Sequence, residues 1–343
     1  MLNLAVDESG ALPLPWLAQP LAEALARQRG HAVLLHGAEG VGTLHFGLAL
    51  AQAWLCEGDA QPRPCGRCPS CRLVQSRLHP DLFVLLPEVM RVAFGWLLAD
   101  DKPDDEGKKK PSRQIRIGEV RAATDWVMKT SARGRGKVLL LHPAEALNPQ
   151  AANALLKTLE EPPTGTRLLL GAADPAQLLP TVRSRCQTLP LAAPPADEAA
   201  RWLAAQGVQG ADVLLAASSG RPLAAQALAA AGIDAAAWAA LPQAVARGQG
   251  AALSGWPVPR AVDALLKLCH DALALAAGGA PRYFPASSLP GRADKDRSGA
   301  IGRLVEWHRS LLRVARHDEH PWQEGLLLDA LVAEGRRALT LTA

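Results

Sequence analysis

The sequence predicts an α/β domain built on a parallel β-sheet, followed by a helical region. The main sign is a strand–helix–strand unit, in which the apolar runs Val138–Leu141 and Arg167–Gly171 flank a segment, Ala151–Leu159, with apolar residues at helical spacing. Two strands joined in this way run parallel, because a helical crossover returns the chain to the same end of the sheet. A second buried strand, Ala32–Leu35, leads into a glycine-rich loop and an apolar helix, and the chain after Asp197 is rich in alanine and leucine.

The helix of this unit has sequence signals at both ends. Asn148 supplies a capping side chain, and Pro149 occupies the first turn, where its missing N–H costs no hydrogen bond. Pro162 and Pro163 end the helix. By similar reasoning we expect a strand over residues 82–86, helices over residues 15–27, 44–56, 120–128, 260–277, 298–316 and 322–339, small helices within 197–231, and a flexible segment over 278–297.

Length and composition limit the class of protein. With 343 residues, of which 49% are hydrophobic and 20% charged, the chain can form two or three domains with real cores. The net charge of +4 permits contact with nucleic acid but does not require it. Because Asp7 and Glu8 lie near the N-terminus and long apolar runs are missing, we expect no signal peptide, no membrane span and a cytoplasmic protein. The six cysteines then indicate a metal site or buried thiols rather than disulfides.

Residues 37–44 have the outline of a phosphate-binding loop without its chemistry. In the pattern G-x-x-x-x-G-K-[ST], lysine contacts the β- and γ-phosphates and the hydroxyl binds Mg²⁺. Here Thr43 stands at the lysine position and Leu44 at the hydroxyl position. We therefore expect a degenerate loop that neither binds ATP tightly nor hydrolyses it; the alternative is an ordinary strand-to-helix turn. The residues whose backbone would still cradle an anion are Gly37, Gly40, Gly42 and Thr43.

The end of the strand Val138–Leu141 lacks the acidic pair that ATP hydrolysis needs. In a hydrolysing enzyme of this type, one carboxylate at this point holds Mg²⁺ and another polarises the attacking water. Here the two positions are His142 and Pro143, and Glu145 lies out of register. Since the lysine, the hydroxyl and both carboxylates are absent, the sequence predicts no intrinsic ATPase activity.

Four cysteines follow a pattern typical of a structural zinc site. They are Cys56, Cys65, Cys68 and Cys71, with the spacing C-x₈-C-x₂-C-x₂-C. Thiolates so spaced reach one ion from a tight turn, and four of them close a tetrahedral Zn²⁺ site that leaves no position for water. The alternatives are four cysteines gathered by chance and a redox role for Cys65 and Cys68, but the additional thiols fit a metal better.

Three stretches resemble the delta-prime family of bacterial DNA polymerase III clamp-loader subunits, which are AAA+ proteins. Asn153–Pro163, NALLKTLEEPP, is similar to a helix that clamp loaders share, and Thr181–Cys186, TVRSRC, is similar to the arginine-finger segment of the family. The four-cysteine insertion is similar to the family's zinc module. The resemblance is strong from about Leu14 to Pro190 and beyond that rests on the order and length of helices.

The resemblance implies three domains and an accessory role in DNA replication. An AAA+ domain over residues 1–190, with a zinc module at 56–71, would precede a helical lid over 191–243 and a helical collar over 244–343 that joins the loader subunits. Such a subunit does not hydrolyse ATP and helps to load the sliding clamp onto primed DNA for the DNA-directed DNA polymerase. The implied partners, met through the collar and AAA+ interfaces, are tau/gamma-type motor subunits, a delta subunit, the clamp and primer–template DNA, with no membrane. Leu223, where motor subunits carry a lid arginine, agrees with this.

The resemblance also implies that Arg185 is an arginine finger for the ATP site of a neighbouring subunit. A guanidinium delivered across an interface stabilises charge on the transferred phosphoryl group, and its planar fork contacts two oxygens at once. Arg183 is the nearby competitor, but Arg185 matches the position in the motif. From the residues alone, an ion pair at a domain boundary is an alternative explanation of Arg185.

Two other functions remain open from the sequence. One is an ATP-hydrolysing motor subunit of the same superfamily, which the missing loop and strand-end residues argue against. The other is a zinc-dependent nucleic-acid-binding module, but the cysteine segment has no aromatic residue for base stacking. The charged insertion over residues 95–114 is expected to be a solvated, mobile loop, although its lysines Lys108–Lys110 could touch nucleic acid.

Overall fold

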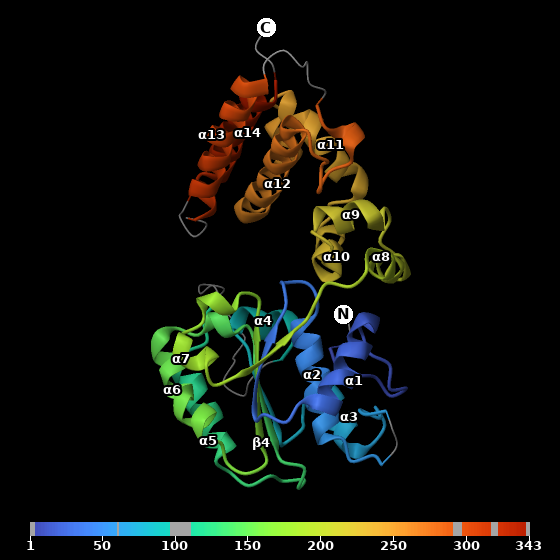
Figure 1. Ribbon diagram of the computed structural model, residues 1–343, viewed down its shortest axis with the longest axis vertical. Helices are drawn as coiled ribbons and strands as arrows, with labels where there is room; N and C mark the ends of the chain where they lie inside the picture. Colours follow the sequence, from blue (N-terminus) through green and yellow to red (C-terminus); the bar gives the residue numbers. More distant parts are fainter. Residues whose placement is uncertain (1–3, 60–61, 97–110, 291–296, 317–321, 341–343) are drawn as a thin grey trace, which may run out of the picture. The chain divides into compact units, whose positions relative to one another are not determined.

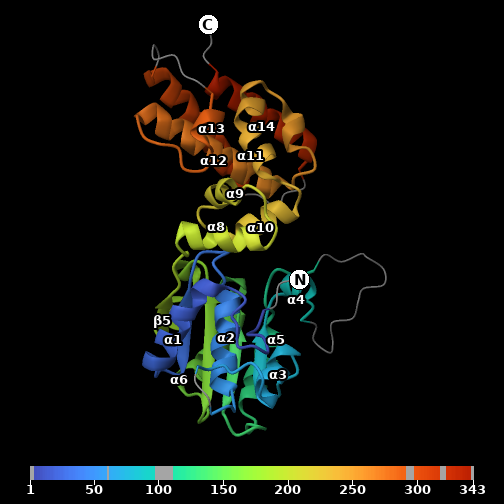
Figure 2. The same cartoon turned by 90° about the vertical axis from the view of Figure 1, so that its right-hand side faces the viewer.

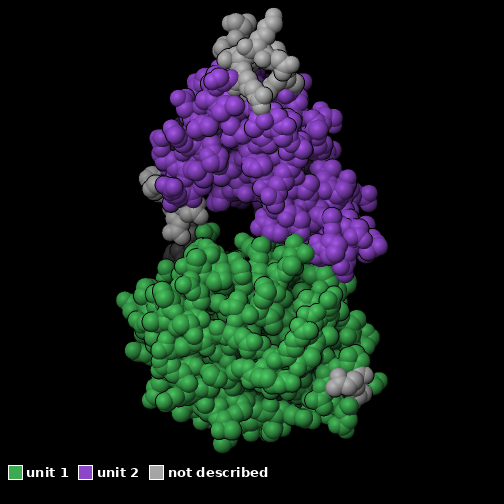
Figure 3. All heavy atoms as spheres, viewed as in Figure 1, with its two compact units in different colours: residues 1–193 green, residues 194–343 purple. Residues whose placement is uncertain are grey.

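The protein folds into two compact units, residues 1–193 and residues 194–343 (Figure 3). The computed structural model describes residues 4–59, 62–96, 111–290, 297–316 and 322–340. The first unit is α/β and the second is helical, which confirms the predicted fold class. The division of the second unit into a lid and a collar stays a prediction.

A five-stranded parallel sheet forms the centre of the first unit (Figure 1). The strands lie in the order β2-β3-β4-β1-β5, and β5 is not among the predicted strands. The strand order switches at β1, and the crevice outside the carboxyl end of such a strand is the usual ligand site of an open α/β sheet. The bounds are β1 Ala32–His36, β2 Leu82–Leu85, β3 Lys137–Leu141, β4 Thr166–Ala172 and β5 Gln187–Pro190.

Helices cover both faces of this sheet (Figures 1 and 2). One face carries α1, α2 and α3, and the other carries α5, α6 and α7. Helix α2 is buried from Thr43 to Ala53, because most of its residues are apolar and they lie around the whole helix. The bounds are α1 Ala18–Arg27, α2 Thr43–Leu55, α3 Pro69–Gln75, α4 Glu88–Phe94, α5 Ile117–Val127, α6 Pro149–Glu160 and α7 Pro180–Arg183.

The structure confirms the predicted strand–helix–strand unit and its cap. The side chain of Asn148 accepts the N–H of Ala151 at 2.9 Å, and Pro149 is the first residue of α6. Leu155 and Leu159 of α6 are buried in the core between α5, α6 and the sheet. Burial of a leucine side chain contributes about 2 kcal/mol. This face of α6 therefore holds the helix, and the residues at its C-terminal end, in a defined place.

The second unit is a set of helices around buried tryptophans. Trp202, Trp238 and Trp307 are buried. The ring of Trp238 stacks on Phe284 with centroids 4.7 Å apart. Helix α11 is not among the predicted helices. The bounds are α8 Ala196–Ala205, α9 Ala211–Ala217, α10 Pro222–Ala230, α11 Ala235–Ala246, α12 Val258–Ala277, α13 Arg297–Ala315 and α14 Glu324–Leu339.

The prediction of a flexible segment over residues 278–297 is wrong for its described part, residues 278–290. The buried carboxylate of Asp271 in α12 accepts the N–H groups of Arg282, Tyr283 and Phe284, each at 2.8 Å. Hydrogen bonds to an ionised carboxylate are among the stronger ones in proteins. They anchor this turn and direct the ring of Phe284 into the core of the second unit.

Two other expectations meet the limits of what the structure describes. The charged insertion, with Lys108–Lys110, falls largely on residues 97–110, which lie outside the described residues. Within the described parts of the chain, no single helix has the length and hydropathy needed to cross a membrane. The bent pair α10 and α11, which meet at 81°, passes that test only when both helices are counted together.

Candidate functional site

The degenerate loop, residues 37–44, lies at the carboxyl end of β1 and leads into α2. Gly42 is the residue before α2 and has φ = +104°, which a residue with a Cβ rarely adopts. The methyl carbon Cδ1 of Leu14 occupies the space where a Cβ on Gly42 would lie. The indole N–H of Trp16 donates to the carbonyl of Val41 at 2.9 Å. The loop thus enters α2 through a glycine in the left-handed region and is braced by the segment before α1.

Thr43 and Leu44, which stand at the two positions that contact the nucleotide and Mg²⁺ in a working loop, make contacts within the protein instead. Thr43 is 6% exposed and its hydroxyl donates to the carbonyl of Gly37 at 3.4 Å, within the loop itself. Leu44 is buried with the rest of α2. The exposed part of the loop carries Glu39, whose carboxylate repels a phosphate rather than attracting it. The loop therefore offers backbone N–H groups without a cation.

The two residues that follow β3, His142 and Pro143, are not acidic. His142 follows β3, and its backbone N–H donates to the carbonyl of Leu85. Glu145 Oε1 accepts the N–H groups of Ala173 at 2.6 Å and Asp174 at 2.7 Å, so this carboxylate is engaged by the chain that follows β4. That Glu145 does not act as a magnesium ligand stays a prediction.

Two imidazoles, the buried His45 and the half-buried His142, lie next to the degenerate loop. The ring of His142 packs beside Gly171, close to Thr43. Both ring nitrogens of His45 and the Nδ1 atom of His142 lack a hydrogen-bond partner among the described residues. Burial lowers the pKa of each histidine from 6.5 to about 4, and the charge of His142 further lowers the pKa of His45. Both rings are therefore neutral at pH 7.

We expect acid to destabilise the chain through this histidine pair. A histidine with pKa near 6.5 when unfolded and about 4 when folded has no effect above pH 6.5. As the pH falls toward 4, the unfolded chain takes up the proton first, so stability is lost. For His45 the loss between pH 7 and pH 5 is about 2 kcal/mol. Urea denaturation at both pH values should show a smaller loss for His45→Leu than for the unchanged chain; equal losses would contradict this.

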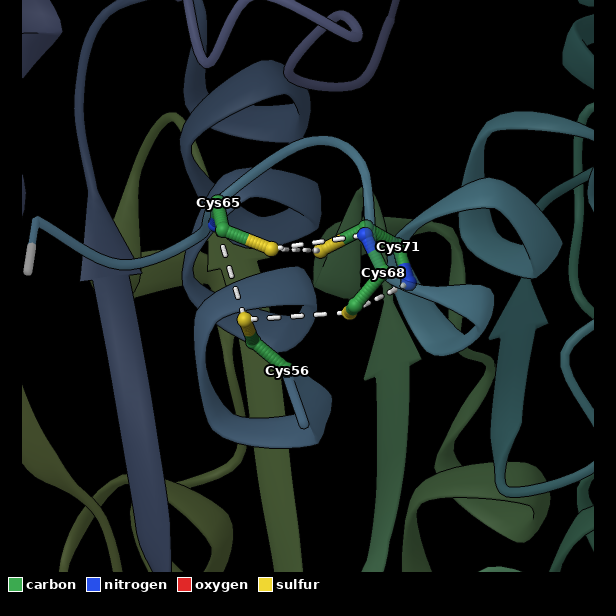
Figure 4. Close-up of side chains that lie close together, drawn as sticks. All are labelled: Cys56, Cys65, Cys68 and Cys71. Carbon is green, nitrogen blue, oxygen red and sulfur yellow. Dashed lines mark hydrogen bonds between the residues drawn. The ribbon is translucent and has the colours of Figure 1, made fainter. Parts of the chain in front are cut away.

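The four predicted metal ligands come together in one cluster, the cysteine cluster (Figure 4). Their sulfur atoms all lie within 4.8 Å of one another, with 3.9 Å between Cys56 and Cys68 and 4.0 Å between Cys65 and Cys71. A tetrahedron of sulfurs around Zn²⁺, with Zn–S bonds of about 2.3 Å, has edges of about 3.8 Å. All four are free thiols rather than disulfides. The arrangement can hold a metal ion.

Local structure explains how the four thiols converge. Cys56 follows the last residue of α2, and Cys68 is the N-cap of α3, where its sulfur accepts the N–H of Cys71 at 3.4 Å. Pro69 fills the first turn of α3. A Cβ on Gly58 would lie 2.9 Å from the sulfur of Cys65, so only glycine permits this close approach.

Hydrogen bonds and burial give the thiols different acidities. Burial acts to raise the pKa of Cys65, but backbone hydrogen bonds from Arg67 and Cys68 outweigh it and lower this pKa to about 6. Burial raises the pKa of Cys56 and of Cys71 above the ordinary range, and for Cys71 the neighbouring thiols add to the effect. Several thiolates in one place repel one another, and a bound cation relieves that repulsion.

Arg185 lies on the surface just after α7 and pairs with Glu160 at the end of α6. Its Nε donates to Glu160 Oε1 at 2.6 Å, and its Nη1 donates to the carbonyl of Thr181 at 2.8 Å. The side chain is 34% exposed and that of Glu160 is 48% exposed. Its competitor Arg183 is also exposed, and its Nη1 contacts the carbonyl of Pro175 at 3.4 Å.

Arg185 and the degenerate loop lie at opposite ends of two neighbouring strands, β5 and β1. β1 and β5 are parallel neighbours, with Val33 beside Gln187 at one end and His36 beside Pro190 at the other. Arg185 precedes β5, whereas the loop follows β1. A four-residue strand spans about 13 Å, which is beyond the reach of an arginine side chain. Arg185 therefore does not serve the loop of its own chain.

Sequence reasoning missed several residues that the structure places beside the site. His45 is one histidine in an apolar helix, a pattern that carries no separate signal. Glu160 is part of the predicted helix, but its pairing with Arg185 depends on the fold of α7. Arg133 forms an ion pair with Glu57, beside the cysteine cluster, across 76 residues of sequence. Only the folded structure brings these pairs together.

The fold and the site together define a class of protein: an α/β domain with a parallel sheet and a glycine-containing loop between β1 and α2, in which Thr43, Leu44 and His142 stand where phosphoryl transfer needs other side chains. The family model described as "DNA polymerase III, delta subunit" matches residues 16–195, more than half of the chain. The chain belongs to this family.

Its curated relatives include delta-prime subunits. The DNA polymerase III subunits delta' of Pseudomonas aeruginosa and Escherichia coli are 40% and 34% identical to the chain over 211 and 221 residues. These matches cover 59% and 62% of this chain, but only 56% and 60% of the two relatives, so the chain spans less than two thirds of their length. The DNA polymerase III subunit tau of E. coli is 32% identical over 156 residues, which is 46% of this chain and 20% of that protein.

Proposed function

We propose that this chain is a non-hydrolysing delta-prime subunit of a cytoplasmic DNA polymerase III clamp loader. In this role it helps to load the sliding clamp onto primed DNA and supplies Arg185 to the ATP site of a neighbouring motor subunit. Its partners are tau/gamma-type motor subunits and a delta subunit, met through the helical collar, residues 244–343, and through the AAA+ domain. Family membership and the names of the curated relatives support this proposal.

The observation that carries the proposal is the replacement of every side chain that ATP hydrolysis needs. Thr43 bonds within the loop, Leu44 is buried, and His142 stands where a magnesium ligand belongs. Phosphoryl transfer depends on positioning and on charge stabilisation by lysine and Mg²⁺. A loop that holds neither lacks the means for tight triphosphate binding or hydrolysis. The chain therefore acts in ATP turnover only through another subunit.

Arg185 is the residue we propose for that action. Its side chain is partly exposed, it is always charged, and it lies before β5, at the end of the strands opposite to its own loop. Its ion pair with Glu160 joins two solvent-exposed side chains, and such pairs contribute about 1 kcal/mol or less. Release of the guanidinium toward a neighbour's phosphate therefore costs little. The same pair is the alternative explanation of Arg185, so the role in another subunit needs the test described below.

We further propose that the cysteine cluster holds one structural Zn²⁺. Four thiolates at tetrahedral separation are the donor set that Zn²⁺ prefers, and a closed set leaves no ligand position for catalysis. When bound, the ion joins the end of α2 to the start of α3. Cys56, Cys65, Cys68 and Cys71 are the proposed ligands.

Reconstitution tests the proposed function. Mixed with tau/gamma-type motor subunits and a delta subunit, the chain should enter a stable complex. DNA-stimulated ATP turnover and clamp loading by that complex should require the chain, because one ATP site lacks its arginine without it. Failure to join the complex would contradict the proposal.

A further inference from the structure

Arg133, in a basic turn outside the cysteine cluster, binds the residue that follows Cys56. Arg133 lies in the turn between α5 and β3, and its guanidinium binds Glu57 with two hydrogen bonds, Nε to Oε1 at 2.7 Å and Nη2 to Oε2 at 2.9 Å. Glu57 directly follows Cys56. Paired bonds of this kind fix the orientation of both groups as well as their distance.

The buried carboxylate of Asp81 binds the backbone of this turn. Asp81 is 0% exposed, and its carboxylate accepts the N–H of Ala132 at 2.7 Å, the N–H of Arg133 at 2.8 Å and the hydroxyl of Ser131 at 2.9 Å. Arg133 thus lies in a turn that Asp81, the residue before β2, holds in place beside Glu57. Such preorganisation means that little freedom is lost when the pair forms.

Asp81 is also connected, through hydrogen bonds of His79 and Ser70, to the chain next to Cys56 and Cys71. The N–H of Asp81 donates to Nδ1 of His79 at 3.0 Å, and Nε2 of His79 is 2.6 Å from the hydroxyl of Ser70. That hydroxyl also lies 2.6 Å from the carbonyl of Leu55, the residue before Cys56. Ser70 in turn precedes Cys71. The residues that flank the ligands are therefore tied to the sheet through two connected routes.

Charge gives the guanidinium a specific role at this place. A divalent cation with four thiolates carries a net charge of −2, and the carboxylate of Glu57 adds a further negative charge beside Cys56. The guanidinium of Arg133 binds this carboxylate through two hydrogen bonds, so its positive charge lies next to the residue that follows Cys56. Removal of this cation leaves Glu57 to repel the thiolates.

We propose that Arg133 is a positioning residue for the metal site: it neutralises Glu57 and anchors the chain at Cys56, so that the cluster binds a divalent cation tightly. This inference rests on the proposed function of the cysteine cluster as a zinc site. The partners that surround metal ligands typically change metal affinity about 10–100-fold when they are replaced.

The test is zinc affinity, measured on the full chain by competition with a chromophoric chelator. We expect Arg133→Gln to weaken zinc binding about 10–100-fold. The double variant Glu57→Gln with Arg133→Gln should recover most of that loss, because it removes the uncompensated carboxylate together with the cation. Arg135→Gln, in the same turn and exposed, is the matched control and should bind zinc as the unchanged chain does.

Two results would overturn the inference. One is unchanged zinc affinity in Arg133→Gln; the other is a loss that Glu57→Gln does not relieve, which would show a role in folding alone. Co²⁺ in place of zinc reports whether each variant keeps a tetrahedral four-sulfur site, and Arg133→Met, which also removes the charge, replaces Arg133→Gln if the latter does not fold. Failure of zinc to bind the unchanged chain would instead overturn the metal site itself.

Discussion

Replacement of Arg185 by alanine should reduce ATP turnover at the adjoining motor subunit by about 10³-fold or more, while the complex still assembles. An arginine provided across an interface stabilises the charge of the transferred phosphoryl group, and its loss has effects of about this size in other phosphoryl-transfer systems. The measurement is single-turnover ATP hydrolysis by the reconstituted loader with primed DNA and clamp. Clamp loading should fall with it.

Arg183→Ala is the matched control, since Arg183 lies two residues away and is also exposed. It should leave turnover close to that of the unchanged complex. Equal, small effects of both substitutions would remove Arg185 from this role and leave its ion pair with Glu160 as its explanation. Loss of assembly with Arg185→Ala would show that the residue holds the interface together rather than acting on nucleotide.

Loss of one cysteine ligand should cost the chain its zinc and a large part of its stability. Cys71 is 1% exposed and its sulfur lies 4.0 Å from that of Cys65, so Cys71→Ser opens the cluster from within. Loss of a structural metal is among the few changes that cost more than about 4 kcal/mol. We expect one zinc per unchanged chain by elemental analysis, less in the variant, and a lower urea midpoint.

Cys186→Ser provides the comparison for this experiment. Cys186 lies outside the cluster, and burial raises the pKa of its thiol to about 11, so it stays a neutral thiol near neutral pH. Its replacement should leave one zinc per chain. A chain that contains no zinc as purified, or a Cys71→Ser variant as stable as the unchanged protein, would contradict the structural-metal proposal.

The parts of the fold that rest on local chemistry could be predicted from the sequence. The cap at Asn148 and the proline after it define the start of α6, and the structure places the first helical residue at Pro149. The spacing of the cysteines has the same local character, since a tight turn brings Cys65, Cys68 and Cys71 together without help from distant residues. Buried strands such as β3 are visible because both of their faces are apolar.

The parts of the fold that depend on contacts between distant residues could not be predicted from the sequence. β5 has only polar or half-exposed residues and ends in Pro190, so its sequence lacks the apolar run of a buried strand; pairing with β1 makes it a strand. Glycine, proline and serine surround the turn at Arg282–Phe284, and these residues are typical of loops. The carboxylate that anchors the turn belongs to Asp271, and nothing in the sequence of its helix marks that residue as an anchor. The polar groups around the cysteine cluster, Arg133 and Glu57, become partners only through the order of the strands.

The most direct test of the account is ATP turnover by the purified chain, alone and within the loader. Alone, with Mg²⁺ and primed DNA, the chain should hydrolyse no ATP above background, because Thr43, Leu44 and His142 replace the groups that perform the reaction. Added to motor and delta subunits, it should raise their DNA-stimulated turnover. Magnesium-dependent hydrolysis by the chain alone, at the rate of a motor subunit, would contradict the account.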